Sequence, residues 1–310
     1  MDNQAEGMSQ ATLHPATHIG LVTLAIASLD RSVTFYERVF GFRVIERSEN
    51  VAMLGAATGN PLLALIQQDG ARPQPPNTTG LYHFAILVPS RADLARAFAH
   101  LVAVRGPLTG YSDHLVSEAL YLSDPDGNGI ELYRDRPRST WQWHNGQVAM
   151  ATDPLDLEGL LEEGRQHSDQ WRELPPQTSI GHIHLRVADL RQAEQFYHGV
   201  LGFDVTAHMP GALFVSAGGY HHHVGLNTWQ SRGAPPPPAD SVGLCFFTIQ
   251  LPDQAEQARV LARLQTAGWS VERQGEAIAL RDPWGNGILL TASSITSVEM
   301  IRGGGLSRSH

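Results

Sequence analysis

The chain contains two copies of one sequence plan. Residues 19–42 (IGLVTLAIASLDRSVTFYERVFGF) align with residues 180–203 (IGHIHLRVADLRQAEQFYHGVLGF) at an offset of 161 positions. Two more matched pairs follow in the same order, TGLYHFAILVP with VGLCFFTIQLP and LSDPDGNGIEL with LRDPWGNGILL. A repeat of this length means that each copy is a structural unit. The sequence therefore predicts two similar halves, residues 18–136 and 179–293, joined by a linker over residues 137–178.

Each half divides again into two modules with the same order of elements. Residues 19–27 alternate in polarity and are rich in β-formers, which favours a strand. Ser28 or Asp30 is expected to cap a helix that ends at Gly41, and three strand-like runs follow (FRVIER, VAMLGA, LLALIQQ). The next module, from Leu81, has a strand, a helix and the strand-like runs VSEALYLS and GIELYRD, and the second half reads in the same way. The predicted fold class is α+β, with four β-α-β-β-β modules.

The linker between the halves is expected to pack on them. It contains Trp141, Trp143 and Trp171 and a short helical pattern, DLEGLLEEG. Within each half, a Pro-rich polar segment separates the two modules, at residues 72–78 and 231–241.

Composition excludes several classes of protein. The 310 residues include 22 Lys+Arg and 31 Asp+Glu, a net charge of −9, which argues against nucleic-acid or anionic-membrane partners. Cys245 is the single cysteine, so the chain cannot form an internal disulfide or a thiolate metal cluster. The first 18 residues do not resemble a secretory signal, and no apolar run is long enough to span a membrane. We expect a cytoplasmic protein; a homo-oligomer is compatible with the sequence, which does not specify an oligomeric state.

The module openings and closings resemble the vicinal oxygen chelate superfamily, which includes glyoxalase I, antibiotic-binding proteins and extradiol dioxygenases. Three longer segments are most similar to two-barrel catechol 2,3-dioxygenases: LYHFAIL, DHLVSEALYLSDPDGNGIELYRDRPRSTW and GGYHHHVGLN. The resemblance implies that two modules curl into one open barrel with a metal ion inside it.

The resemblance also implies where the metal ligands lie, at the third residue of each opening strand and at the Glu of each closing strand. The opening positions in modules one to four are occupied by Leu21, His83, His182 and Phe246. The closing positions in modules two and four are occupied by Glu131 and Leu289, and Gly225 aligns with them in module three. Only His83, Glu131 and His182 can bind a metal. Two imidazoles and a carboxylate form the facial triad of non-haem Fe(II) oxygenases, and Mn(II) accepts the same set.

This ligand set has a consequence for the topology. If consecutive modules formed the barrels, His182 would lie in a different barrel from His83 and Glu131. We therefore predict that module two pairs with module three and module one with module four.

The resemblance implies three further site residues. His222 in the His221-His222-His223 run matches an acid–base histidine, although His221 and His223 remain alternatives; a strand here would turn alternate side chains to solvent. Tyr121 lies ten residues before Glu131, where the family has a hydrogen-bonding tyrosine, and His114 resembles a histidine that supports it. For His184 we favour a buried, hydrogen-bonded structural role.

The function implied by the resemblance is extradiol cleavage of catechol or a substituted catechol by O₂ at Fe(II), in aromatic hydrocarbon catabolism. The partners would be a small aromatic diol and O₂. Two other functions remain open, a glyoxalase-like metal-dependent isomerase or lyase and a non-catalytic small-molecule binding protein. The first usually has a second carboxylate or a Gln in its ligand set, and the second needs no metal ligands.

Overall fold

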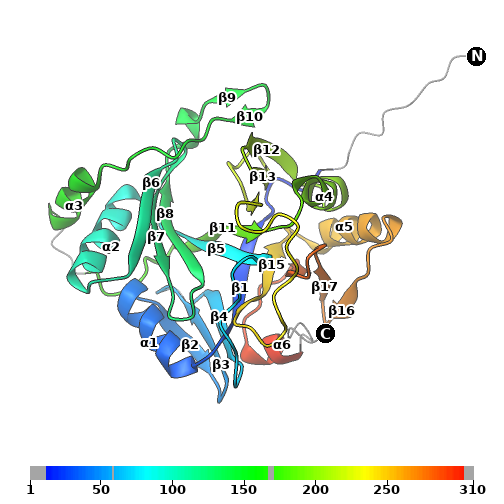
Figure 1. Ribbon diagram of the computed structural model, residues 1–310, viewed down its shortest axis with the longest axis horizontal. Helices are drawn as coiled ribbons and strands as arrows, with labels where there is room; N and C mark the ends of the chain where they lie inside the picture. Colours follow the sequence, from blue (N-terminus) through cyan, green and yellow to red (C-terminus); the bar gives the residue numbers. More distant parts are fainter. Residues whose placement is uncertain (1–11, 58, 167–170, 304–310) are drawn as a thin grey trace, which may run out of the picture.

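The structure is a computed structural model that describes residues 12–57, 59–166 and 171–303 (Figure 1). The N-terminal segment, in which the sequence indicates no secretory signal, lies largely outside the described residues. Modules one and two comprise β1 (His18–Ile26), α1 (Leu29–Phe40), β2 (Arg43–Arg47), β3 (Val51–Gly55), β4 (Pro61–Gln67), and then β5 (Gly80–Leu87), α2 (Arg91–Ala103), β6 (Leu108–Asp113), β7 (Ser117–Ser123) and β8 (Gly129–Asp135).

The second half has the same plan. Modules three and four comprise β11 (Ser179–Arg186), α4 (Leu190–Glu194), the π-helical turn η2 (Gln195–Val200), β12 (Asp204–Met209), β13 (Ala212–Ser216), β14 (Val224–Asn227), and then β15 (Gly243–Gln250), α5 (Gln254–Thr266), β16 (Glu272–Gln274), β17 (Ala277–Arg281) and β18 (Gly287–Thr291). The remaining elements are η1 (Arg138–Thr140), β9 (Trp143–His144), β10 (Gln147–Val148), α3 (Leu157–Gln166) and α6 (Val298–Gly303). All four modules have the predicted element order; β6 is a strand that the sequence analysis did not identify.

The modules combine into two curled eight-stranded sheets across the two halves. One sheet has the order β16-β17-β18-β15-β1-β4-β3-β2, and the other has the order β12-β13-β14-β11-β5-β8-β7-β6. The two modules of each sheet meet along an antiparallel seam, β1 against β15 and β5 against β11. The predicted pairing of modules two with three and one with four is confirmed. We call these the 2+3 barrel and the 1+4 barrel.

Alternation along the seam strands separates a shared core from the two barrel interiors. On β1, the side chains of Val22, Leu24 and Ile26 belong to the main apolar core, which also includes residues of β5, β11 and β15. Leu21 and Ala25 point to the other face, into the 1+4 barrel. Because successive side chains of a strand point to opposite faces, one short segment supplies both the core and the barrel lining.

The repeated Phe-Tyr and Asp-Pro motifs join consecutive modules. The hydroxyl of Tyr36 on α1 donates to Oδ2 of Asp124, in the turn before β8, over 3.0 Å. Tyr197 on η2 donates to Oδ2 of Asp282, before β18, over 3.1 Å. Since consecutive modules belong to different barrels, these matched bonds connect one barrel to the other.

The first helix begins and ends as its sequence predicts. The Ser28 side chain accepts a hydrogen bond from the Arg31 backbone N–H, and Gly41 ends the helix with a φ of 76°. A left-handed residue at this position favours glycine. A Cβ at Gly41 would also lie 2.7 Å from the Cα of Glu173, in the linker.

The linker packs on both halves, as expected, through two of its three tryptophans. Trp141 is buried in an apolar cluster with Val116 of module two and Phe214 of module three. The indole N–H of Trp171 donates to the backbone oxygen of Phe40 over 3.1 Å. Trp143 is exposed. The helical pattern in the linker forms α3, which lies against α2 (Figure 1).

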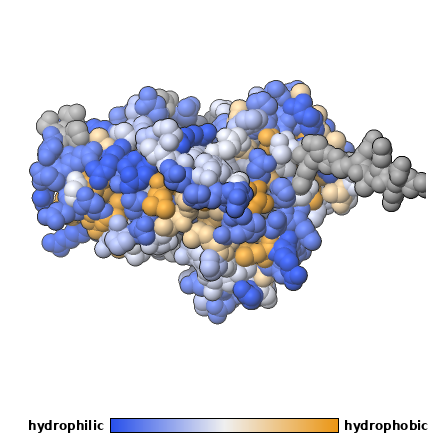
Figure 2. All heavy atoms as spheres, turned by 90° about the horizontal axis from the view of Figure 1, so that it is seen from above, coloured by the Kyte–Doolittle hydropathy of each residue, from blue (hydrophilic) through white to orange (hydrophobic). Residues whose placement is uncertain are grey.

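Polar residues cover most of the face shown in Figure 2, and apolar residues appear there in small separate patches. None of the helices in the described residues is both long enough and apolar enough to cross a bilayer.

Candidate metal centre

Strand register places four equivalent positions in each barrel. In every module, the closing residue lies opposite the residue two positions after the opening residue: Thr23 opposite Ala64, Ala85 opposite Glu131, His184 opposite Gly225, and Thr248 opposite Leu289. The alignment of Gly225 with the closing position is thus supported by register, and Ala64 is its counterpart in module one. In the 2+3 barrel the four positions are His83, Glu131, His182 and Gly225.

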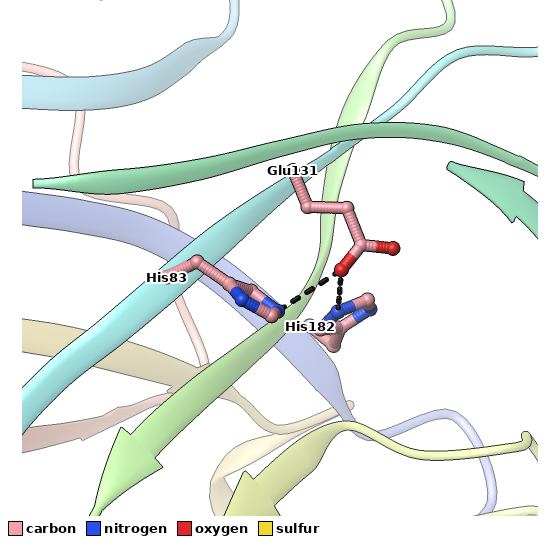
Figure 3. A group of neighbouring side chains, drawn as sticks. All are labelled: His83, Glu131 and His182. Atoms are coloured by element: carbon pink, nitrogen blue, oxygen red, sulfur yellow. Dashed lines mark hydrogen bonds and ion pairs between the residues drawn. The ribbon is translucent and has the colours of Figure 1, made fainter. Parts of the chain in front are cut away.

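The three predicted ligand residues converge inside the 2+3 barrel. His83 on β5, Glu131 on β8 and His182 on β11 each offer a ligand atom, and these atoms lie within 4.8 Å of one another (Figure 3). Oε2 of Glu131 is 3.0 Å from Nε2 of His83 and 3.2 Å from Nε2 of His182. All three side chains are buried, with exposed fractions of 6%, 3% and 1%.

Burial and mutual charge favour the metal-binding forms of Glu131 and His182. Burial would raise the pKa of Glu131, but the imidazoles of His182 and His83 lower that pKa well below its usual value. Burial lowers the pKa of His182 to about 4, against the attraction of Glu131. An ionised carboxylate beside a neutral imidazole is the pair of forms that coordinates a cation.

The geometry of the three donors fits one divalent ion. Metal–ligand bonds of about 2.1 Å place two ligands at right angles about 3.0 Å apart, close to the observed separations. Nε2 of His83 is shielded from solvent, and within the described part of the chain it makes no well-aligned hydrogen bond, although Oε2 of Glu131 is 3.0 Å away. A buried nitrogen without a partner is costly unless something else satisfies it. A cation at the centre would satisfy both imidazoles and the carboxylate.

The fourth position of the barrel carries no ligand. Gly225 has no side chain, and a Cβ there would lie 2.9 Å from the His184 ring, which occupies that space. His184 is buried and its ring lies 4.9 Å from that of His83. It is buried, as the sequence led us to expect, and among the described residues its Nε2 has no hydrogen-bond partner. The barrel thus offers three candidate ligands, and an ion held by them would have room for other molecules.

Tyr121 and His114 form one hydrogen-bonded unit beside the ligands. Tyr121 on β7 pairs in register with Glu131, and its hydroxyl lies 2.6 Å from Nε2 of His114. Nδ1 of His114 lies 2.6 Å from the carbonyl oxygen of Ala151, so it donates there and leaves Nε2 to accept from Tyr121. Burial and the charge of Glu131 raise the pKa of Tyr121 well above its usual value, so the phenol keeps its proton.

The histidine run lies in a loop rather than in the strand suggested by the sequence. Residues 217–223 precede β14, and all three histidines are buried rather than alternating with solvent. The ring of His222 lies 4.1 Å from that of His182. His221 lies behind it, with Nδ1 2.8 Å from Nδ1 of His222. His223 points away from the centre, and its Nδ1 accepts from the Ala217 backbone N–H over 3.1 Å.

A cavity of about 600 Å³ opens beside the three ligand residues. Tyr121, His114, His184 and His222 line it together with His83 and Glu131. The apolar part of its lining includes Tyr82, Val116, Met150, Met209, Phe214 and Trp229. Among the described residues that line it there is no arginine, and Glu131 is the one carboxylate. The cavity therefore suits a weakly polar molecule with its polar end at the candidate ligands.

Asp135 is a site residue that was not predicted from the sequence; its Oδ1 lies 2.9 Å from Nε2 of His221. It is four residues after Glu131 on β8, so strand alternation places it on the same face. That spacing was a usable signal. Its partner His221 is the first residue of a histidine run in a loop, where no periodic pattern indicates which way a side chain points.

Comparison with known proteins agrees with this architecture. The family model described as "Glyoxalase/Bleomycin resistance protein/Dioxygenase superfamily" matches residues 18–132 and 179–290. The "Catechol-2,3-dioxygenase" of Bacillus subtilis (strain 168) is 49% identical over 276 residues, which cover 88% of this chain and 96% of that protein.

Solved structures share the fold at low sequence identity. A crystal structure from Bacillus subtilis subsp. subtilis str. 168 has a TM-score of 0.62 and 15% identity, covering 90% of this chain and 86% of that one. Glyoxalase I from Zea mays has a TM-score of 0.53 and 17% identity, covering 89% and 92%. Because the family model matches most of the sequence and both copies of the repeat, the chain belongs to the glyoxalase/bleomycin resistance protein/dioxygenase superfamily.

Proposed function

We propose that the protein is an extradiol ring-cleaving dioxygenase that acts on catechol or a substituted catechol with O₂ at an Fe(II) site. His83, Glu131 and His182 would hold the ion. The observation that carries the proposal is the ligand set itself, with two imidazoles, one carboxylate and a glycine at the fourth position. The 49% identity to a protein named catechol-2,3-dioxygenase supports it.

The open side of the centre suits the two substrates. When bound, Fe(II) would pass electrons from catechol to O₂ with no net change in its own oxidation state, and it would supply a cationic centre for both catechol oxygens. Three protein ligands leave coordination positions for two substrates, as the facial triad does in general. The apolar part of the lining limits access of water to the ring.

His222 would transfer protons to and from the substrate, and Tyr121 would bind it by a hydrogen bond. Nδ1 of His222 is engaged by His221, so Nε2 is the nitrogen left to take a proton from a catechol hydroxyl and return it later. Burial lowers the pKa of His222 well below its usual value, so the ring is neutral and able to accept that proton. Tyr121 already donates to His114, and its oxygen can accept a hydrogen bond from substrate.

An isomerase or lyase of the glyoxalase type remains the principal alternative. Its ligand set usually contains a further carboxylate or a Gln, and the available position is Gly225. A binding protein without chemistry would have no use for three buried ligand groups. Iron is favoured over manganese by the proposed chemistry rather than by the ligand types, which accept both.

The test is anaerobic purification with metal analysis, followed by addition of catechol and air. We expect about one iron per chain, a yellow ring-fission product and uptake of one O₂ per product formed. Separate reconstitution with Fe(II) and Mn(II) identifies the active metal. Substoichiometric metal together with no colour change would contradict the proposal and favour a binding protein.

Substitutions locate the reaction in one barrel. His83→Ala, Glu131→Ala and His182→Ala are each expected to abolish metal retention and ring cleavage. The matched controls are Leu21→Ala, Phe246→Ala and Leu289→Ala, which change the equivalent positions of the 1+4 barrel and should keep bound metal. Full iron occupancy in the His182 variant would contradict a site shared by modules two and three.

A further inference from the structure

Three groups form a hydrogen-bonded chain that runs away from the cavity behind His222. Nδ1 of His222 lies 2.8 Å from Nδ1 of His221, and Nε2 of His221 lies 2.9 Å from Oδ1 of Asp135. The His221 side chain is fully buried, and that of Asp135 is 25% exposed. The chain therefore begins at the cavity wall and ends near solvent.

Hydrogen-bonding capacity fixes the direction of this chain. An ionised aspartate has only acceptors, and Oδ1 of Asp135 also accepts from the Tyr220 hydroxyl over 3.2 Å. His221 must therefore donate from Nε2. With one N–H per ring, Nδ1 of His221 is then an acceptor, so His222 donates from its own Nδ1. The nitrogen of His222 that remains without a proton is Nε2.

We propose that Asp135 and His221 are positioning residues that hold His222 in the Nδ1–H form, with Nε2 ready to accept a proton in the cavity. This inference rests on the proposed function, in which His222 is the acid–base group. The two positioning residues do not touch the substrate and act only through His222. A carboxylate that orients a histidine in this way is a common device around reactive imidazoles.

The packing around His221 supports a fixed orientation. Its ring lies 4.1 Å from that of Tyr220 and 5.2 Å from that of Trp141, which belongs to the linker. The Tyr220 hydroxyl is also 2.7 Å from that of Tyr133, on β8. These contacts leave the imidazole little freedom to rotate.

The chain also crosses the boundary between two modules. Asp135 ends β8 of module two, whereas His221 and His222 belong to module three. The acid–base group can therefore be oriented only when modules two and three share a barrel.

Two variant pairs test the proposal in the full-length chain. Asp135→Asn replaces the acceptor by an amide that can donate to His221 and reverse the chain, and Asp153→Asn is its matched control because Asp153 is exposed. His221→Phe removes both hydrogen bonds, whereas His221→Gln keeps a donor for Asp135 and an acceptor for His222. The pair separates lost packing from lost hydrogen bonding.

The first readout is the tautomer of His222, measured by ¹⁵N NMR of histidine-labelled protein loaded with diamagnetic Zn(II). The signal is assigned by its loss in His222→Phe. We expect the Nδ1–H form in the wild type, His221→Gln and Asp153→Asn, and a shift toward the Nε2–H form in Asp135→Asn. An unchanged His222 tautomer in Asp135→Asn and His221→Phe would overturn the proposal.

The second readout is steady-state cleavage of catechol by the iron-loaded variants. We expect kcat to fall about 10- to 100-fold in Asp135→Asn and His221→Phe, with KM within about twofold of the wild type, and His221→Gln to retain most of the lost rate. Equal losses in His221→Gln and His221→Phe would overturn the relay. If the wild type does not cleave catechol, the proposed function fails, but the tautomer measurement still decides the orientation of His222.

Discussion

The two barrels have the same topology but opposite interiors. In the 2+3 barrel the four equivalent positions are His83, Glu131, His182 and Gly225, next to a cavity of about 600 Å³. In the 1+4 barrel they are Phe246, Leu289, Leu21 and Ala64, which lie together in one apolar cluster. The same strand pairings form around the candidate ligands of one barrel and around the apolar residues of the other, so the fold does not depend on the ligand side chains. The residues at these positions decide whether a barrel becomes core or site.

The chain itself fills the apolar barrel. Ile295 and two residues of α6, Val298 and Ile301, belong to the same cluster as Leu21 and Leu289. This segment follows the last strand of module four and lies against β3 (Figure 1). The 2+3 barrel has no corresponding helix among the described residues, since its modules are followed by the linker and by β15. Covering the apolar lining of the 1+4 barrel with this segment stabilises the fold by burying apolar surface, whereas the polar lining of the 2+3 barrel stays accessible to small molecules.

The largest expected effect comes from placing a carboxylate in the apolar barrel. Leu289→Glu puts at position 289 the residue type found at position 131, but without imidazoles to pair with it. A buried charge without a partner costs about 3–5 kcal/mol. Denaturant unfolding of the metal-free protein should show a loss of this size.

Leu115→Glu is the control, because Leu115 is 45% exposed and the same change should cost less than about 0.5 kcal/mol there. Leu289→Glu and Leu115→Glu should both bind as much metal as the wild type when folded. A loss below about 1 kcal/mol at position 289 would mean that the 1+4 barrel is accessible to water.

A somewhat smaller effect is expected from weakening the packing of α6 on the 1+4 barrel. The double variant Val298→Ala/Ile301→Ala removes buried methyl groups from the apolar cluster and should cost about 3 kcal/mol. Met300→Ala, on the exposed side of the same helix, should cost less than about 0.5 kcal/mol. Thermal unfolding measures both, and metal content should stay at the wild-type level. Loss of metal in the double variant would show that the two barrels are coupled.

The topology and the three candidate ligand residues could be predicted from sequence. Residues able to bind a metal occupy the motif positions of modules two and three, and apolar residues occupy those of modules one and four, so a complete site requires modules two and three to pair. The packing of the histidine run could not be predicted. His221, His222 and His223 suggested a strand, but they lie in a loop where each ring has a different partner. The local sequence pattern does not predict such contacts, because they are made with β8 and with the linker, which are distant from the run in the sequence.

For His184, too, the sequence predicts the position on a strand but not the contacts of the side chain. Its place on β11 followed from its spacing to His182, but its missing hydrogen bond did not. Its ring fits because register puts Gly225 beside it, and that register is set by the pairing of β11 with β14. In the 1+4 barrel, Thr23 is the residue two positions after Leu21, as His184 is after His182, and it lies opposite Ala64, where a side chain is present.

Acid should weaken the barrel with histidines and spare the other. Burial lowers the pKa of His223 to about 3, from 6.5 in an unfolded chain. Between these values the unfolded state binds more protons than the folded state, so stability falls as the pH falls from about 6.5 toward 3. One such group contributes a slope of about 1.4 kcal/mol per pH unit. At the equivalent positions of the 1+4 barrel, the apolar residues Leu21, Ala64, Phe246 and Leu289 do not titrate.

His223→Asn tests this slope because an amide oxygen can replace Nδ1 as the acceptor for the Ala217 N–H but does not titrate. Denaturant unfolding of metal-free protein between pH 4 and pH 6 should show a slope smaller by about 1.4 kcal/mol per pH unit than in the wild type. His208→Asn, at an exposed histidine, should leave the slope nearly unchanged. If the His223 variant keeps the wild-type slope, the acid sensitivity of this barrel arises from its other buried histidines.

The smallest effects should be equal in the two halves. Tyr36→Phe removes the bond to Asp124, and Tyr197→Phe removes the bond to Asp282. In both cases the carboxylate keeps its bonds to a neighbouring asparagine and to backbone N–H groups, so each change should cost about 1 kcal/mol. Thermal unfolding of the two single variants and the double variant should give additive losses, because the two bonds share no residue. These bonds connect the barrels without entering either interior, so neither change should affect metal content. A larger loss for Tyr197→Phe would mean that the link from module three to module four also supports the metal centre, and the two barrels would then differ in their framework as well as in their lining.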